Sequence, residues 1–133
     1  MIKQDYLIRM IQEIIALLVN IIINKQKIRE QKWSEFDNLT ARILGISTTE
    51  ELLRMDSDTL IQKYKDDADF FGKLELAAMY QIKLAEELTD DSLFYRTKLQ
   101  QTALQLLTYI QTEGNTFSLS RIQVIHHLEK EIN

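Results

Sequence analysis

The fold is decided by residues 5–32, DYLIRMIQEIIALLVNIIINKQKIREQK, in which apolar side chains leave only a thin polar seam. At helical spacing the apolar residues form two neighbouring stripes. The first stripe comprises Leu7, Ile11, Ile14, Leu18, Ile21 and Ile28, and the second comprises Ile8, Ile15, Val19 and Ile22. A helix with two apolar faces needs two covers, so the sequence predicts a central or interfacial helix over 5–32.

Length and composition indicate one globular domain, residues 1–133, with 45% hydrophobic and 27% charged residues. The chain has no proline and three glycines, so little interrupts long helices. It has no cysteine, which excludes disulfides, thiolate metal sites and a cysteine nucleophile, and fits the reducing cytoplasm where we expect the protein. A net charge of -4 disfavours general binding to nucleic acid.

Periodicity and capping residues predict six further helices. Gly45 is suited to end a helix, either Ser47 with Glu50 or Thr48 with Glu51 makes a capping box, and Asp56 opens another helix. The predicted helices lie near 34–44, 48–55, 56–65, 70–88, 91–112 and 118–132, after the first helix at 5–32. The fold class is therefore all-α: a helical bundle or stacked helical hairpins, loosely similar to tetratricopeptide repeats, around the apolar N-terminal helix.

The predicted core follows the apolar faces of these helices. Ser118 starts the last helix, where Phe117 and Ile122 are spaced as a hydrophobic staple. The inner stripe of that helix is predicted to be Leu119, Ile122, Ile125, Leu128 and Ile132. The full core prediction is Leu7, Ile11, Ile14, Leu18, Ile22, Phe36, Leu74, Ala78, Ile82, Leu99, Ala103, Leu106, Ile122, Ile125 and Leu128.

Two groups of side chains contain residue types that bind metals. The Asp66, Asp67 and Asp69 cluster departs from the calcium-loop pattern, which needs Glu at its twelfth position, where counting from Asp67 gives Ala78. His126 and His127 are adjacent, so they point about 100° apart on a helix and do not share one metal. The sequence therefore predicts no metal site and no cofactor.

The apolar character of the first helix raises the question of a membrane segment. The apolar run from Ile14 to Ile23 is shorter than the ~20 residues that a bilayer needs, and no small-residue cleavage site follows it. The basic residues after it, Lys25 to Lys32, are typical of a solvated helix end. We expect no membrane span.

Two segments carry a family resemblance. The opening Gln4-Asp5-Tyr6-Leu7-Ile8-Arg9-Met10-Ile11 and the Thr116-Phe117-Ser118-Leu119 start of the last helix resemble a family of small, uncharacterised, all-helical bacterial proteins. The resemblance extends over Trp33 to Gly45 and Lys73 to Met79. It implies a helical bacterial protein and brings no catalytic residue to this chain.

The favoured functional interpretation is a non-enzymatic interaction, scaffold or regulatory protein that uses apolar helix faces. The interface candidates are Ile8, Ile15, Val19 and Ile22, which we expect to meet a protein partner, such as a second copy in a twofold homodimer. The first alternative is a small-ligand sensor or enzyme with a pocket between helices. Its polar groups would come from Tyr80, Tyr95, Tyr109, Arg96, Asp91 or a histidine. The second alternative is membrane-surface association through the N-terminal helix. No catalytic residue is predicted.

Overall fold

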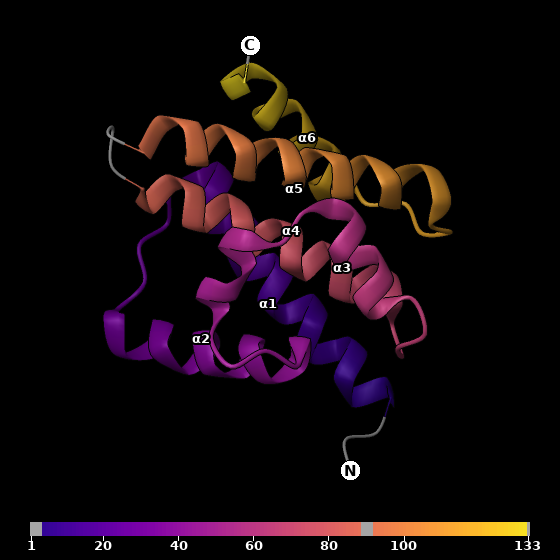
Figure 1. Cartoon of the computed structure of the whole chain (residues 1–133). Coiled ribbons are helices and arrows are strands. Elements are labelled where there is room, and N and C mark those ends of the chain that lie inside the picture. Colours follow the sequence, from indigo (N-terminus) through magenta and orange to yellow (C-terminus); the bar gives the residue numbers. More distant parts are fainter. Residues whose placement is uncertain (1–3, 89–91, 133) are drawn as a thin grey trace.

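The computed structural model describes residues 4–88 and 92–132, and within them the chain forms seven helices and no strand. The predicted all-α fold class is confirmed. In chain order the helices are α1 (Gln4–Asn24), α2 (Glu30–Leu44), the 3-10 helix η1 (Thr49–Arg54), α3 (Ser57–Tyr64), α4 (Phe70–Glu87), α5 (Leu93–Glu113) and α6 (Leu119–Ile132), as Figure 1 shows.

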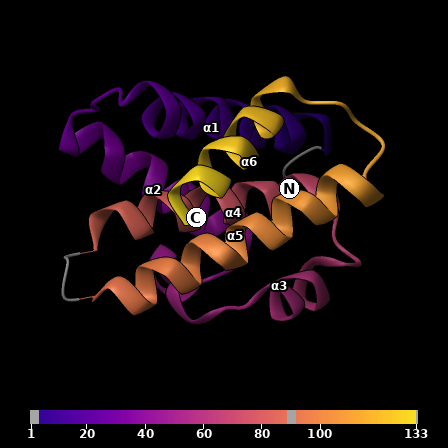
Figure 2. The same cartoon turned by 90° about the horizontal axis from the view of Figure 1, so that it is seen from above.

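The centre of the fold is α4, whereas the sequence placed the N-terminal helix there. Twelve of the 18 residues of α4 are buried, against six of the 21 residues of α1. Helix α4 packs against α1, α2, η1, α3 and α5. With α5 it forms an antiparallel hairpin, and α6 lies between α1 and α5 (Figure 2).

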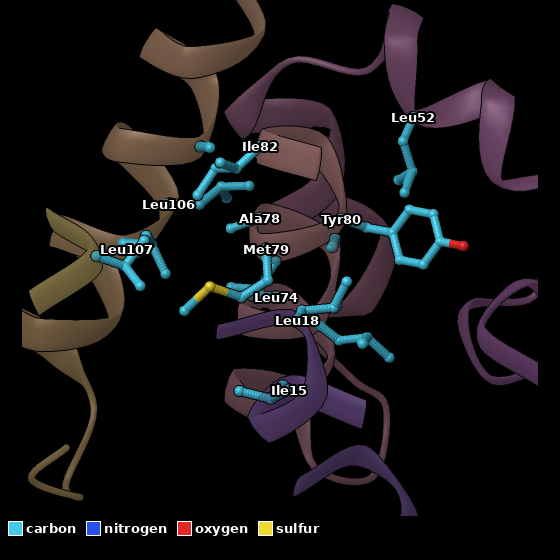
Figure 3. Packing of buried hydrophobic residues seen from close by; sticks show 14 of the residues in the cluster. Ile15, Leu18, Leu52, Leu74, Ala78, Met79, Tyr80, Ile82, Leu106 and Leu107 are labelled. Atoms are coloured by element: carbon cyan, nitrogen blue, oxygen red, sulfur yellow. The ribbon is translucent and has the colours of Figure 1, made fainter. Parts of the chain in front are cut away.

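The core lies where α1, α4 and α5 meet. Leu18 of α1 approaches α4, and Leu106 approaches it from α5, while Leu52 of η1 contacts the opposite side (Figure 3). Ala77 and Ala78 carry no bulk beyond Cβ, so neighbouring helices can approach α4 closely. Of the predicted core, Leu7, Phe36, Ile122 and Ile125 are only partly buried, and the other eleven residues are buried.

The long first helix ends eight residues earlier than predicted. Helix α1 stops at Asn24, where Lys25 takes the left-handed conformation with φ +54°. The Gln26 N–H then donates to the Asn20 carbonyl at 3.2 Å, and α2 begins at Glu30. The predicted helix over 5–32 is therefore wrong beyond residue 24. The helix predicted over 34–44 corresponds to α2, which begins four residues earlier than predicted. No glycine or proline marks this break in the sequence.

Most of the predicted helix ends are confirmed. Gly45 ends α2 with φ +66°, and the Thr59 N–H donates to Asp56 Oδ1 at 2.8 Å at the start of α3. The Glu51 carboxylate accepts the Ser47 N–H at 2.7 Å and the Thr48 N–H at 3.4 Å, which is the glutamate half of the predicted capping box. The segment that follows is a 3-10 helix rather than an α-helix. The predicted start of helix 91–112 lies outside the described residues.

The inner face of α6 differs from its prediction. Arg121, Val124 and Leu128 are its buried residues, and Leu119 is 61% exposed. The sequence pattern favoured the purely apolar stripe, but the helix turns a charged residue inward because that residue finds a buried partner. The face of α6 is therefore determined by a contact between distant parts of the chain.

Candidate interaction site

A groove of about 440 Å³ lies between α1 and the start of α6. One wall comes from α1, the floor includes a residue of α4, and the second wall is the segment that leads from α5 into α6. The lining residues are Ile8, Gln12, Ile15, Ala16, Val19, Glu75, Thr116, Phe117, Ser118, Ser120 and Arg121. The α1 wall is mainly apolar, and the α6 wall carries hydroxyl groups and one phenyl ring.

The floor of the groove is a buried ion pair. Arg121 Nε donates to Glu75 Oε1 at 2.9 Å, and Nη2 donates to Oε2 at 3.4 Å. The Nη1 atom of Arg121 donates to Gln111 Oε1 at 2.8 Å and to the Thr116 carbonyl at 3.1 Å. The two charged side chains are 3% and 8% exposed, so each compensates the desolvation of the other. Arg121 thereby fixes α6 to α4, α5 and the segment between α5 and α6.

The rim of the groove carries one prominent apolar side chain. Phe117 is 77% exposed, so the predicted staple with Ile122 does not bury its ring. The predicted cap at Ser118 is confirmed, because Ser118 Oγ accepts the Arg121 N–H at 3.1 Å. This cap fixes the chain direction immediately after Phe117. The phenyl ring therefore borders the groove from a well-defined segment and stays in contact with solvent.

The structure corrects the predicted interface stripe. Ile22 is fully buried, and Ile15 and Val19 are 7% and 8% exposed, because α4 and α6 cover this side of α1. Only Ile8 of the four candidates is half-exposed. Ile15 and Val19 belong to the deep wall of the groove, and Ile22 belongs to the core. The stripe is therefore covered mostly within the chain and is no open docking face.

The polar residues weighed for an inter-helix pocket do not gather in one place. Tyr80 is 1% exposed and its hydroxyl donates to Asp37, which also accepts the Thr49 hydroxyl at 2.6 Å. Burial raises the pKa of Tyr80 above its usual range, and Asp37 raises it further, so this hydroxyl stays protonated. Tyr109 packs against Phe70 and Phe71. Tyr95 and His126 are exposed, Arg96 and His127 are half-buried, and Asp91 lies outside the described residues.

Sequence reasoning missed two polar arrangements. The first is the Arg121 and Glu75 pair. The second joins α2 and α4, where Lys83 Nζ lies 3.9 Å from the ring centre of Trp33 and Trp33 stacks on Tyr80. The spacing of Arg121, Val124 and Leu128 on one helical face was a usable signal for the first. Nothing in the sequence relates residue 33 to residue 83.

Two other surface features involve apolar side chains. A second hollow, of about 460 Å³, lies between α1 and α2 and is lined by Tyr6, Leu7, Met10, Leu39, Arg42 and Ile43. Leu93, Phe94 and Tyr95 at the start of α5 are 64%, 75% and 63% exposed. The hollow has one charged lining residue, Arg42, and no acid beside it in the lining. Neither feature brings together the groups of a catalytic site.

No group of three or more metal-ligating side chains occurs among residues 4–88 and 92–132. Asp67 of the predicted acidic cluster pairs with Lys73 at 3.0 Å. Asp69 precedes α4 at φ +54°, and its Oδ2 would lie 2.1 Å from a Cβ at position 72, so a larger residue there would displace the Asp69 carboxylate. The acidic cluster thus belongs to the start of α4.

Helix α1 is long and apolar enough to cross a membrane by length and composition. A core helix of a soluble protein and a signal sequence near the N-terminus meet the same criteria, and 33% of the apolar window is buried here. Comparison of the chain with protein-family models, with curated proteins and with solved structures gives no match. The resemblance to small helical bacterial proteins therefore stays a prediction.

Proposed function

We propose that this chain is a non-enzymatic interaction protein that binds a protein partner in the groove between α1 and α6. The observation that carries the proposal is the position of Phe117. Its ring is 77% exposed and borders a groove whose opposite wall includes Ile8 and Ala16. Exposed aromatic side chains beside apolar hollows are the features from which interface hot spots are built.

The chemistry of the lining supports binding. The two charged groups in the groove, Glu75 and Arg121, are bound to each other and to neighbouring polar groups. An apolar side chain that enters the groove therefore leaves no new unpaired charge behind it. The remaining polar groups are an amide and hydroxyls, which can exchange water for a partner's backbone groups. A groove with apolar residues on its α1 wall and hydroxyl groups on its α6 wall suits a side chain or short segment of another protein.

A hydrolytic function is the rival, and the lining favours it less. Thr116, Ser118 and Ser120 bring hydroxyl groups to the groove. Activation of a hydroxyl nucleophile requires a general base within hydrogen-bond reach. The lining contains no histidine, and its one carboxylate is held by Arg121.

Photo-crosslinking in the native host tests the proposal. A photoreactive phenylalanine analogue would replace Ala16 or Ser120, two exposed residues of the groove lining, or Ser34 or Gln62, two exposed residues elsewhere. We expect protein adducts at the groove positions and none at the control positions. Adducts at all four positions, or at none, would contradict a specific interaction through this groove.

A further inference from the structure

We infer that residues 25–39, the linker after α1 together with the first part of α2, form a lid that opens while the rest of the fold stays intact. The lid lies at the lower left of the fold in Figure 1, and none of its residues is buried. No lid residue lines the groove between α1 and α6, so this inference does not depend on the proposed function. The buried residues of α2 all lie beyond the lid: Thr40, Ala41, Ile43 and Leu44.

Polar and aromatic contacts hold the lid on α4. The Asp37 carboxylate accepts a hydrogen bond from the Tyr80 hydroxyl and another from the Thr49 hydroxyl at 2.6 Å. The Trp33 and Tyr80 rings stack with 5.5 Å between their centres, and Lys83 Nζ lies 3.9 Å from the centre of Trp33. Tyr80 and Lys83 are three residues apart and share one face of α4, and the Tyr80 ring points away from α5 (Figure 3). The lid is therefore held on a different side of α4 from the one that packs against α5.

The start of the lid is weakly fixed. Lys25 takes φ +54°, and its Nζ pairs with Glu86 at 3.2 Å, but the lysine side chain is 63% exposed. Exposed ion pairs contribute little to stability. Arg29, at the N-cap position of α2, makes no side-chain hydrogen bond to the start of the helix. The first N–H groups of α2 therefore lack a side-chain cap, which favours opening from this end.

The end of the lid also favours opening. The Thr40 hydroxyl, next to the lid, is buried without a hydrogen-bond partner among the residues that the structure describes. A buried polar group without a partner destabilises the closed form. Opening as far as residue 39 would admit water to this hydroxyl, and that offsets part of the free energy that opening requires.

The closed lid hides apolar surface. Trp33, Phe36 and Leu39 are half-buried, and they pack against the core from the lid. Segments with few buried apolar side chains open at a lower free energy than the whole domain needs to unfold. The lid is therefore a conformational device, whose open form exposes three apolar side chains that the closed form covers.

Native-state hydrogen exchange of the full chain tests the inference. We expect the amides of residues 34–39, after correction for intrinsic rates, to exchange at least tenfold faster than the slowest amides of α4. Their rates should change little at low urea concentrations, because lid opening exposes little surface, whereas the α4 rates should rise steeply. Lid amides with the rates and urea dependence of α4 would open only in global unfolding, which would overturn the inference.

Two variants separate lid opening from a loss of overall stability. Tyr80→Phe keeps the ring but removes the hydroxyl that donates to Asp37, a contact that lid opening and global unfolding both break. It should speed exchange in the lid and in α4 by the same factor, about tenfold for a hydrogen bond to a charged group. The control Ser118→Ala removes the cap of α6, which lid opening leaves intact. It should speed the slowest α4 exchange severalfold and leave the lid amides at the wild-type rate.

Lys83→Met tests the second contact of the lid. It removes the ammonium group from the face of Trp33 and leaves the Glu87 carboxylate, which is 56% exposed, in contact with water. We expect severalfold faster exchange of the lid amides. Unchanged lid exchange in both Tyr80→Phe and Lys83→Met would overturn the inference, as would a Ser118→Ala variant that speeds the lid amides as much as those of α4.

Discussion

Arg121 shows how one residue can organise three helices. Its guanidinium makes four hydrogen bonds, to Glu75, Gln111 and the Thr116 carbonyl, while its side chain is 3% exposed. A buried charge of this kind is tolerated only while its partner is present. The same interactions hold the segment that presents Phe117, so the geometry of the groove depends on this ion pair.

Removal of one member of the Glu75–Arg121 pair should destabilise the fold far more than removal of both. We expect Glu75→Leu to lower the free energy of unfolding by about 3–5 kcal/mol, because it leaves the Arg121 charge buried without its carboxylate. The double variant Glu75→Leu with Arg121→Met should recover most of this loss, since apolar side chains of similar size can replace a buried pair. Urea unfolding of the two variants and the wild type measures both values. A single variant as stable as the double one would show that the pair is not coupled.

At the scale of elements, the break between α1 and α2 is the clearest departure from the sequence pattern. Lys25 takes φ +54°, a conformation that disfavours residues with a Cβ, and its Nζ lies 3.2 Å from Glu86 Oε1. Helix ends at Gly45 and Asp56 were predictable because their residue types are suited to those positions. Lysine has no such preference, so the residue type at position 25 does not mark the end of α1.

Two substitutions of Lys25 separate the effect of its backbone conformation on stability from the effect of its charge. Lys25→Gly relieves the left-handed conformation and loses the exposed ion pair, whereas Lys25→Ala loses the ion pair alone. We expect the glycine variant to be about 1 kcal/mol more stable than the alanine variant, because a left-handed residue with a Cβ costs roughly that amount. Thermal or urea unfolding of both variants gives the difference. Equal stability would mean that the chain relaxes out of this conformation when the ion pair is lost.

At the scale of the whole molecule, the sequence predicted the helices and the all-α class but not the central helix. Glu75, Gln81 and Lys83 made α4 look amphipathic, yet all three are buried. Gln81 Nε2 donates to the carbonyls of Leu52 and Met55, which lie 29 and 26 residues earlier. From sequence alone, a polar residue is expected to face solvent unless its buried partner is known. The partners of Glu75 and Gln81 lie far away in the sequence, so their burial could not be predicted. Three residues of the predicted interface stripe, Ile8, Ile15 and Val19, line the groove, whereas Ile22 lies in the core and the sequence predicted Phe117 only as part of a local staple.

The burial of one side of α1 under α4 and α6 can be tested by placing a charge on that side. Ile15 is 7% exposed within one chain, so Ile15→Glu should unfold the protein rather than release a folded monomer. We expect a loss above about 4 kcal/mol, from lost apolar burial together with a charge that has no partner. Far-ultraviolet circular dichroism and urea unfolding would follow this variant, with the adjacent exposed Ala16→Glu as the control that stays folded. A folded, helical Ile15→Glu monomer would show that the predicted stripe of Ile8, Ile15, Val19 and Ile22 is exposed rather than covered within the chain.

The packing of α1 on α4 also has a consequence for how the protein is made. Helix α1 ends at Asn24, but α4, which covers it, ends 63 residues later at Glu87. At about 5–20 residues per second, the ribosome needs roughly 3 to 13 s to complete that cover after α1 has been synthesised. During this interval the six α1 side chains that the fold buries have no partner from α4. Translation speed and access to chaperones should therefore affect the yield of soluble protein more than small changes in equilibrium stability do.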